Sequence, residues 1–96
     1  MIVAHSTYSR RLADEDKSLI TEHLAFIKQG FDEGTFVAAG PRKSSIGGVV
    51  VARGISEDDL RALMQQDPFV RAGLVGEYEM MTFAVSMASV DGLLEK

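Results

Sequence analysis

The stretch Asp67-Pro68-Phe69-Val70-Arg71-Ala72-Gly73-Leu74 places a carboxylate directly before a proline and thereby separates two helical segments. Proline disfavours helical geometry in the residue before it, so the helix ahead must end before Asp67. An Asp followed by Pro is also a common helix start. We therefore expect a short helix over residues 68–72, with Gly73 as its stop.

The helix ahead of this stretch is predicted to begin after Ser56, because Ser56 and Asp59 form a weak version of a capping box. Its apolar residues are Leu60, Leu63 and Met64. Asp67 comes next in the series of Leu60 and Met64, so an acid lies at the edge of an apolar surface. An acid in that place is either a helix cap or one half of a functional site.

Another helix is predicted over residues 17–31, where the apolar residues recur at spacings of four, three and four. They form one stripe, made of Ile20, Leu24, Ile27 and Phe31. Gly34 is a plausible C-terminal stop for this helix. His23 lies about 60° from the centre of the stripe on a helical wheel, so it is neither fully buried nor fully exposed.

Four segments carry the composition of β-strands, and residues 9–16 form a polar loop after the first of them. The predicted strands cover residues 2–8, 35–39, 46–53 and 75–85. With the two helices the order becomes β-α-β-β-α-β, which is the ferredoxin-like arrangement. We expect an α+β fold in which an antiparallel sheet carries both helices on one face. No linker divides the chain, so residues 1–96 are expected to form a single domain.

Both faces of the predicted sheet carry apolar side chains, because the strands lack the alternation of a sheet with one face in water. Val49, Val50 and Val51 are consecutive, as are Met80 and Met81. The helices can cover only one face, so we expect a homodimer in which sheet packs against sheet. The alternative is a sheet covered by the C-terminal tail, residues 86–96. That tail has a short apolar group, Val90, Leu93 and Leu94, which either folds back or docks on a partner.

The composition excludes several classes of protein. The 96 residues have a net charge of −4 and scattered basic residues, which argues against nucleic-acid binding. No apolar run approaches the length of a membrane span, and the N-terminal residues lack the pattern of a secretory signal. We therefore expect a cytoplasmic protein that does not contact membranes. The absence of cysteine excludes a thiol nucleophile.

The chain resembles the YciI-like family of small dimeric α+β barrel domains over residues 2–83. The residues that carry the resemblance are Thr7, Tyr8, His23, Gly34, Ala39-Gly40-Pro41, Gly47-Gly48, Asp67-Pro68-Phe69, Gly73 and Tyr78-Glu79. The resemblance implies a ferredoxin-like fold, a dimer and an active site built on a histidine and an aspartate, here His23 and Asp67. Some members of the family act on lactone-like or chlorinated ring-cleavage products, although a shared fold does not transmit a reaction.

His23 and Asp67 are the candidate catalytic residues. An imidazole can take and give a proton near neutral pH, and an aspartate behind it fixes one ring nitrogen while the other stays free. Position alone favours a boundary histidine bonded to a backbone carbonyl, and the family resemblance favours the catalytic role. Asp67 is compatible with capping alone or with capping and orienting His23, since a carboxylate has two oxygens.

The candidate substrate-binding residues are Tyr8, Arg10, Arg42, Gly40 and Pro41. Gly40 and Pro41 bound a loop where small residues let a ligand approach the backbone, or where they serve turn formation only. Arginines are good partners for a carboxylate, so Arg10 and Arg42 together indicate an anionic small molecule, although each one taken singly is better explained as solvated surface charge. His5 and His23 share no metal-binding motif, and we expect neither metal nor cofactor.

Three functions remain open on the sequence alone, the third being a purely structural interaction domain if no pocket is large enough for a ligand. The first is a small enzyme in which His23 and Asp67 perform acid–base chemistry on a small anionic or carbonyl-bearing molecule. Isomerisation, lactone chemistry and elimination all fit, because each needs a mobile proton and no nucleophile from the protein. The second is a module that binds a small ligand, as a sensor does, without catalysis.

Overall fold

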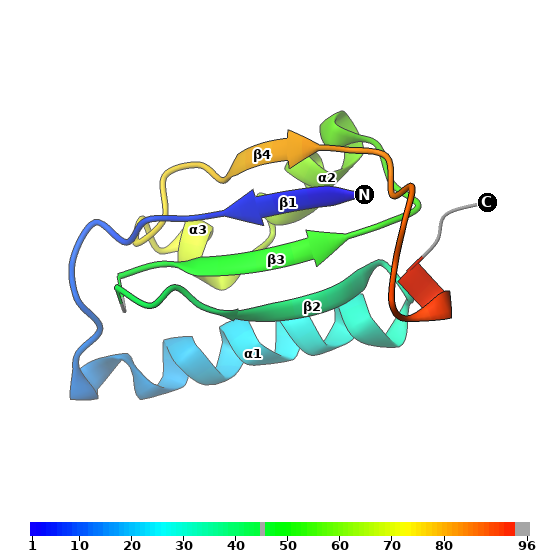
Figure 1. The fold of residues 1–96 in the computed structure, drawn as a ribbon. Helices are drawn as coiled ribbons and strands as arrows, with labels where there is room; N and C mark the ends of the chain where they lie inside the picture. The colour runs from blue at the N-terminus through cyan, green and yellow to red at the C-terminus, as the bar shows by residue number, and fades with distance from the viewer. Residues whose placement is uncertain (45, 94–96) are drawn as a thin grey trace.

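The computed structural model describes residues 1–44 and 46–93 and has the predicted α+β, ferredoxin-like fold (Figure 1). The four strands form one antiparallel sheet in the order β2-β3-β1-β4. The elements are β1 (Ile2–His5), α1 (Lys17–Asp32), β2 (Phe36–Pro41), β3 (Gly48–Ala52), α2 (Glu57–Met64), α3 (Pro68–Arg71) and β4 (Glu79–Thr82). Short 3-10 turns at Asp14–Asp16 and Asp91–Leu93 precede α1 and follow β4.

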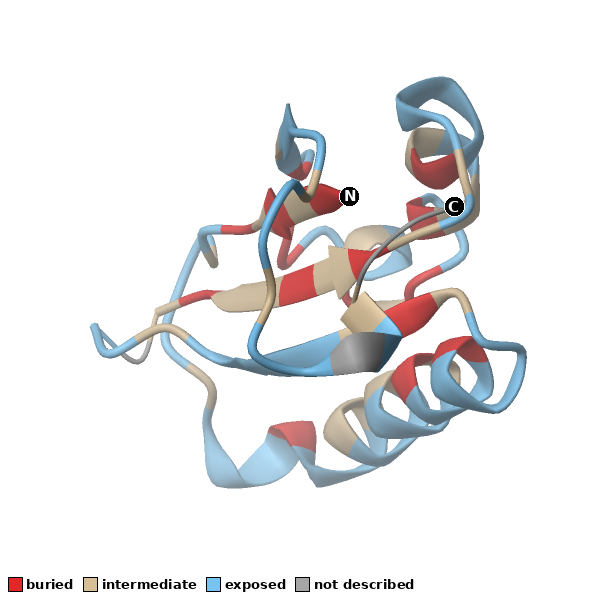
Figure 2. Ribbon diagram, turned by 45° about the vertical axis from the view of Figure 1, so that its right-hand side comes forward, coloured by how far each residue is buried: buried red, intermediate tan, exposed pale blue. Residues whose placement is uncertain are grey.

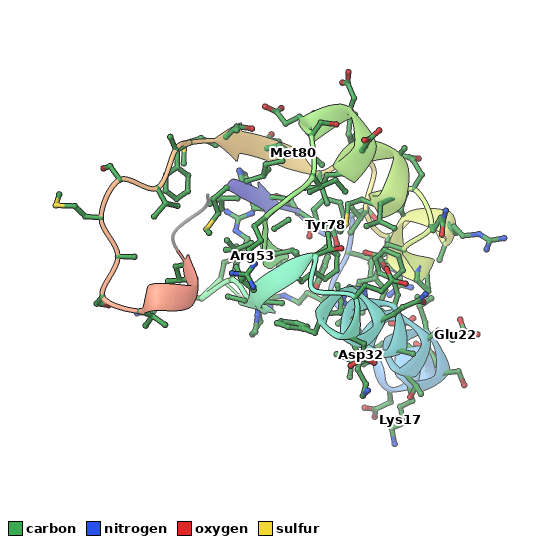
Figure 3. The ribbon with its side chains drawn as sticks, turned by 90° about the vertical axis from the view of Figure 1, so that its right-hand side faces the viewer. Lys17, Glu22, Asp32, Arg53, Tyr78 and Met80 are labelled. Carbon is green, nitrogen blue, oxygen red and sulfur yellow. The ribbon has the colours of Figure 1, made fainter. Side chains whose placement is uncertain are left out.

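The helices all lie on one side of the sheet, as the sequence predicts (Figure 3). Alternate residues of the two central strands face them, so Ile2 and Ala4 of β1 and Val50 and Ala52 of β3 are buried. Figure 2 shows buried and half-buried positions alternating along β3. The rest of the core comes mainly from the helices and from the segment before β4: Ile27, Phe36, Leu60, Met64, Phe69, Leu74, Val75 and Tyr78.

The apolar stripe of α1 is only partly buried. Ile27 is 8% exposed, whereas Leu24 and Phe31 are 59% and 42% exposed. Ile20, Leu24, Ile27 and Phe31 all line a cavity between α1 and the sheet. The helix ends as predicted, because Gly34 has a φ of 78°, a left-handed conformation that favours glycine.

The last strand is much shorter than predicted, since β4 covers Glu79–Thr82 rather than residues 75–85. Residues 75–78 have strand composition but leave the sheet, because Val75 and Tyr78 turn into the core. An isolated bridge between Val75 and Tyr8 holds this segment against the chain that follows β1. Burial of two large side chains therefore outweighs the local preference for a strand.

The other strand ends also differ from the prediction. β1 stops at His5, yet the backbone N–H groups of Ser6 and Tyr8 still donate to the carbonyls of Gly48 and Ile46. β2 does not end before Gly40 but continues through Pro41, with Pro41 opposite Gly48. Proline is tolerated there because β2 lies at the edge of the sheet, where one side of the strand needs no donor.

The face of the sheet opposite the helices carries an apolar row. In the register, Val3 lies between Val51 of β3 and Met81 of β4. The tail after β4 lies on this side of the sheet (Figure 3), yet Met81 is 63% exposed and Met87 of the tail 88% exposed. The described part of the tail therefore leaves Met81 exposed, while Val3 and Val51 are half-buried. Of its predicted apolar group, Val90 is exposed, Leu93 half-buried and Leu94 outside the described residues.

Within residues 1–44 and 46–93, no helix has both the length and the apolar character needed to span a bilayer.

Candidate active site

Asp67 is a fully buried carboxylate held at the start of α3. Helix α2 ends at Met64, and Asp67 takes an extended conformation with a ψ of 125° before Pro68 opens the next helix. Its Oδ1 accepts a hydrogen bond from the backbone N–H of Phe69 at 3.0 Å. Gly73 ends the short helix with a φ of 78°. Asp67 is therefore an N-cap, as one of the two sequence interpretations requires.

The same carboxylate also meets His23, which comes from α1, the helix that packs against α3. Nδ1 of His23 lies 2.7 Å from Oδ1 of Asp67, and the His23 side chain is 16% exposed while that of Asp67 is 0% exposed. The imidazole stacks on the Phe69 ring with 3.8 Å between centroids and 2° between planes. Both contacts fix the orientation of the His23 ring.

Tyr78 is the third partner of Asp67 and was missing from the residues proposed from the sequence. Its hydroxyl donates to Oδ2 of Asp67 at 2.7 Å, and the side chain is buried. Burial, with the charge of Asp67 and this hydrogen bond, raises the pKa of Tyr78 well above its usual 10.0, while a hydrogen bond with Ser6 opposes the shift. The sequence shows that a tyrosine stands at position 78, but it does not show that the side chain points toward α3 rather than lying in the sheet.

The tautomer of His23 follows from these contacts. Asp67 receives donors from Phe69 and Tyr78 on its two oxygens. An ionised carboxylate only accepts, so Nδ1 of His23 carries the hydrogen and donates it. Nε2 then carries a lone pair, and it has no hydrogen-bond partner among the described residues. A free basic nitrogen is what a general base requires.

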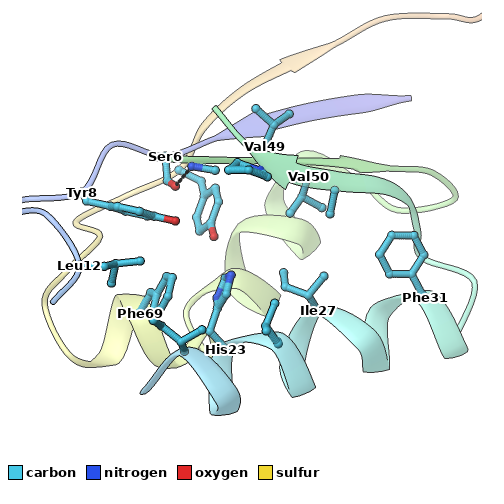
Figure 4. Close-up of a pocket in the computed structure, with 16 residues that line it drawn as sticks. Ser6, Tyr8, Leu12, His23, Ile27, Phe31, Val49, Val50 and Phe69 are labelled. Atoms are coloured by element: carbon cyan, nitrogen blue, oxygen red, sulfur yellow. Dashed lines mark hydrogen bonds between the residues drawn. The ribbon is translucent and has the colours of Figure 1, made fainter. Parts of the chain in front are cut away.

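A cavity of about 300 Å³ opens beside His23, between α1 and the sheet (Figure 4). Its lining is mostly apolar, and the polar side chains that reach it are Ser6, Tyr8, His23 and Tyr78. The other lining residues are Leu12, Ile20, Leu24, Ile27, Phe31, Ala39, Gly40, Pro41, Gly48, Val49, Val50 and Phe69. A largely apolar pocket with a few convergent polar groups has the form of a small-molecule site.

Tyr8 directs its hydroxyl into this cavity, and the Tyr8 ring packs edge-on against Phe69 at 5.5 Å between centroids. Burial, and to a lesser extent the charge of Asp67, raises the pKa of Tyr8 from 10.0. The hydroxyl therefore stays protonated at neutral pH and has no hydrogen-bond partner among the described residues. Tyr8 can donate to a ligand oxygen.

Both tyrosines are expected to resist ionisation in the folded protein. The chain has two tyrosines, and the pKa of each is raised from 10.0. The folded state then binds more protons than the unfolded state above about pH 10, so the contribution of the two tyrosines to stability is constant below that pH and is lost as the pH rises further. Absorbance at 295 nm should show tyrosinate only as the protein unfolds. A reversible native transition near pH 10 would contradict this environment.

The glycines near the site have a packing role as well as a place in the lining. Gly40, Pro41 and Gly48 line the cavity. Gly47 does not, and a Cβ on Gly47 would lie 2.0 Å from the carbonyl oxygen of Ser6. No larger residue fits there without moving the backbone that carries Ser6. The close approach at Gly47 is therefore between two chain segments, rather than between the chain and a ligand.

Neither of the two predicted arginines lines the cavity. Arg10 forms two hydrogen bonds with Asp16, at 2.7 and 2.9 Å, which lower the pKa of Asp16 to about 2. Arg42 donates to the Ser6 carbonyl and to the Thr7 hydroxyl. The expectation that Arg10 and Arg42 hold a substrate carboxylate thus has no geometric support in this chain. Their charges serve the structure of neighbouring loops.

Metal-binding clusters of three or more His, Asp or Glu side chains are absent from residues 1–44 and 46–93.

Comparison with known proteins identifies the family. The model of the YCII-related domain matches residues 1–84 of the chain. The chain belongs to the YCII-related domain family. The resemblance noted over residues 2–83 is thereby confirmed, and His23, Asp67 and Tyr78 of this YCII-related domain all lie within the matched part. No curated protein matches the chain significantly.

A solved structure supports the fold of this YCII-related domain. It is 5-chloro-2-hydroxyhydroquinone dehydrochlorinase from Burkholderia phenoliruptrix AC1100, in complex with 2,5-dihydroxybenzoquinone. The two chains are 18% identical and superpose with a TM-score of 0.66, over 86% of this chain and 93% of that chain. At this level of identity the similarity establishes the shared fold only.

Proposed function

We propose that this YCII-related domain is a small enzyme in which His23 transfers protons to and from a molecule bound in the cavity. The observation that carries the proposal is the contact between Nδ1 of His23 and Asp67, which leaves Nε2 free beside an open cavity. Asp67 is the orienting residue, and Tyr8, Gly40 and Pro41 contact the substrate. A fold shared with a dehydrochlorinase is consistent with such chemistry.

The proposed reaction begins when Nε2 of His23 removes a proton from an O–H or C–H group of the substrate. The electron pair left behind forms a new π bond. In an elimination, a leaving group departs with its bonding pair, and His23 later returns the proton to water. In an isomerisation, His23 returns the proton to a different carbon. Neither course needs a protein nucleophile, an oxidant or a reductant, and we expect either to occur in the cytoplasm.

A carbonyl-bearing or hydroxyl-bearing substrate fits the cavity better than an anionic one. Ser6, Tyr8, His23 and Tyr78 supply its polar side chains, and none of these is a permanent cation. Asp67 places a negative charge directly behind His23. A carboxylate in the cavity would lose its hydration without gaining a paired cation, which is costly. Of the two substrate classes that the sequence allows, anionic and carbonyl-bearing, the cavity therefore favours the carbonyl-bearing one.

The test is turnover of 5-chloro-2-hydroxyhydroquinone, followed by chloride release, together with a panel of enolisable ketones and lactones. The enzyme proposal expects turnover of at least one compound, with a rate that depends on His23. Binding without turnover across the whole panel would overturn it. That result would favour the second candidate, a non-enzymatic ligand-binding module, which the mainly apolar cavity also suits.

We also propose that two copies pair through the sheet face opposite the helices. The support is the apolar row of Val3, Val51 and Met81, in which Met81 is 63% exposed. Sedimentation velocity should give twice the 10.4 kDa chain mass. Met81→Lys should shift the protein toward the monomer, whereas Ala62→Lys, on the exposed surface of α2, should not. A wild-type monomer at all concentrations would exclude this pairing.

A further inference from the structure

The cavity has two chemically different ends. Figure 4 shows Ser6, Tyr8 and His23 grouped at one end and Phe31 at the other, with Ile27 and Val50 between them. Every polar side chain of the lining thus belongs to the end nearest α3, where Tyr78 bonds to Asp67. A ligand that satisfies both ends must itself be polar at one end and apolar at the other.

Only two groups at the polar end are free to bind a ligand. Ser6 accepts from the backbone N–H of Gly48 at 3.1 Å, and Tyr78 donates to Asp67. The hydroxyl of Tyr8 and Nε2 of His23 have no partner among the described residues. They offer one donor and one acceptor, which match a hydroxyl group or an enolised carbonyl.

The apolar end is large enough to hold part of the ligand. The cavity of about 300 Å³ is at the lower end of the range for small-molecule sites, about 300–1,000 Å³, which suits a ligand of one ring with a short side chain. Phe31 is 42% exposed at this end, so a bound apolar group would remove it from water.

We propose that the ligand of this site is a single-ring phenol, or the enol of a cyclic ketone, that carries a short apolar substituent directed toward Phe31. This inference rests on the proposed function for the role of His23 and adds the chemical class of the substrate. Phe31 is then a specificity-determining residue. The hydroxyl of the ligand donates to Nε2 of His23 and accepts from the hydroxyl of Tyr8.

The test is the affinity of a homologous series, phenol, 4-methylphenol, 4-ethylphenol and 4-propylphenol, measured by NMR titration of the wild-type protein. Burial of each added carbon should tighten binding about threefold, and therefore about thirtyfold between phenol and 4-propylphenol. The signals that move should include those of His23 and Tyr8. Equal affinity for all four compounds would overturn the proposal.

A matched pair of variants tests whether the preference for 4-propylphenol over phenol arises in the cavity. Phe31→Gln makes the apolar end polar and should reduce the thirtyfold preference to about threefold or less, with little change in the affinity for phenol. Phe83→Gln is the control, because Phe83 is 44% exposed, close to the 42% of Phe31, but does not line the cavity. It should keep the full preference. If Phe31→Gln changes the sedimentation mass and leaves the preference intact, Phe31 serves a protein contact and the proposal fails.

The experiments distinguish a failure of the proposed ligand class from a failure of the enzyme proposal. His23→Gln is expected to remove turnover and to retain the preference for 4-propylphenol, because the apolar end is untouched. A wild-type protein that prefers 4-propylphenol but turns over no compound would contradict the enzyme proposal and leave the ligand class intact. A protein that catalyses turnover but binds the four phenols equally would contradict the proposed ligand class and leave the enzyme proposal intact.

Discussion

Replacing His23 by glutamine should lower kcat about 10²–10⁴-fold, the usual contribution of a positioned general acid or base. The substitution removes the lone pair that Nε2 presents to the cavity, and an amide nitrogen cannot replace it as a base. Because the lining is otherwise unchanged, KM should change much less than kcat. The measurement is steady-state kinetics on whichever compound the wild-type protein turns over.

The fold should survive this substitution, since the glutamine amide is long enough to donate to Asp67 in place of Nδ1. His5→Gln is the matched control, because His5 is the other histidine and lies near Glu79, at 3.3 Å, without lining the cavity. Its activity should equal that of the wild type. Full activity in His23→Gln would exclude His23 as the acid or base and leave the ligand-binding alternative.

Replacing Asp67 by alanine should reduce the free energy of unfolding by about 3–5 kcal/mol, because each buried donor left without its acceptor costs about 1–3 kcal/mol. Three donors would lose their acceptor: Nδ1 of His23, the N–H of Phe69 and the hydroxyl of Tyr78. The cap of α3 would be lost at the same time. Urea denaturation followed by circular dichroism measures the change.

Two further substitutions calibrate the loss. Tyr78→Phe removes one hydrogen bond to the carboxylate and should cost about 1.5–3 kcal/mol. Asp58→Ala removes an exposed acid from the first turn of α2 and should cost less than about 1 kcal/mol. A loss for Asp67→Ala no larger than that for Asp58→Ala would show that the buried network does not support the fold.

The element order and the helix ends could be predicted because local chemistry determines them. Ser56 accepts from the N–H of Asp59 at the start of α2, and Gly34 and Gly73 end α1 and α3 in left-handed conformations. Asp67 before Pro68 marks the break between α2 and α3. Each feature depends on a few neighbouring residues, so the sequence carries the information directly.

The cavity and the third partner of Asp67 could not be predicted, because they depend on how distant segments pack. Residues 75–78 have the composition of a strand, yet Tyr78 leaves the sheet to reach Asp67. The periodicity of α1 marks Leu24 and Phe31 as apolar but does not say that they face a cavity rather than the core. The sequence also does not show that the guanidinium of Arg10 is paired, because its hydrogen bonds with Asp16 depend on the folded loop.

The most direct test of the account is nitrogen NMR of the His23 ring, with and without 4-propylphenol. We predict that Nδ1 carries the hydrogen in the free protein and that the Nε2 signal moves when the phenol is added, while the signals of His5 do not. A hydrogen on Nε2 in the free protein, or a His23 ring that does not respond to any bound ligand, would contradict the proposed site.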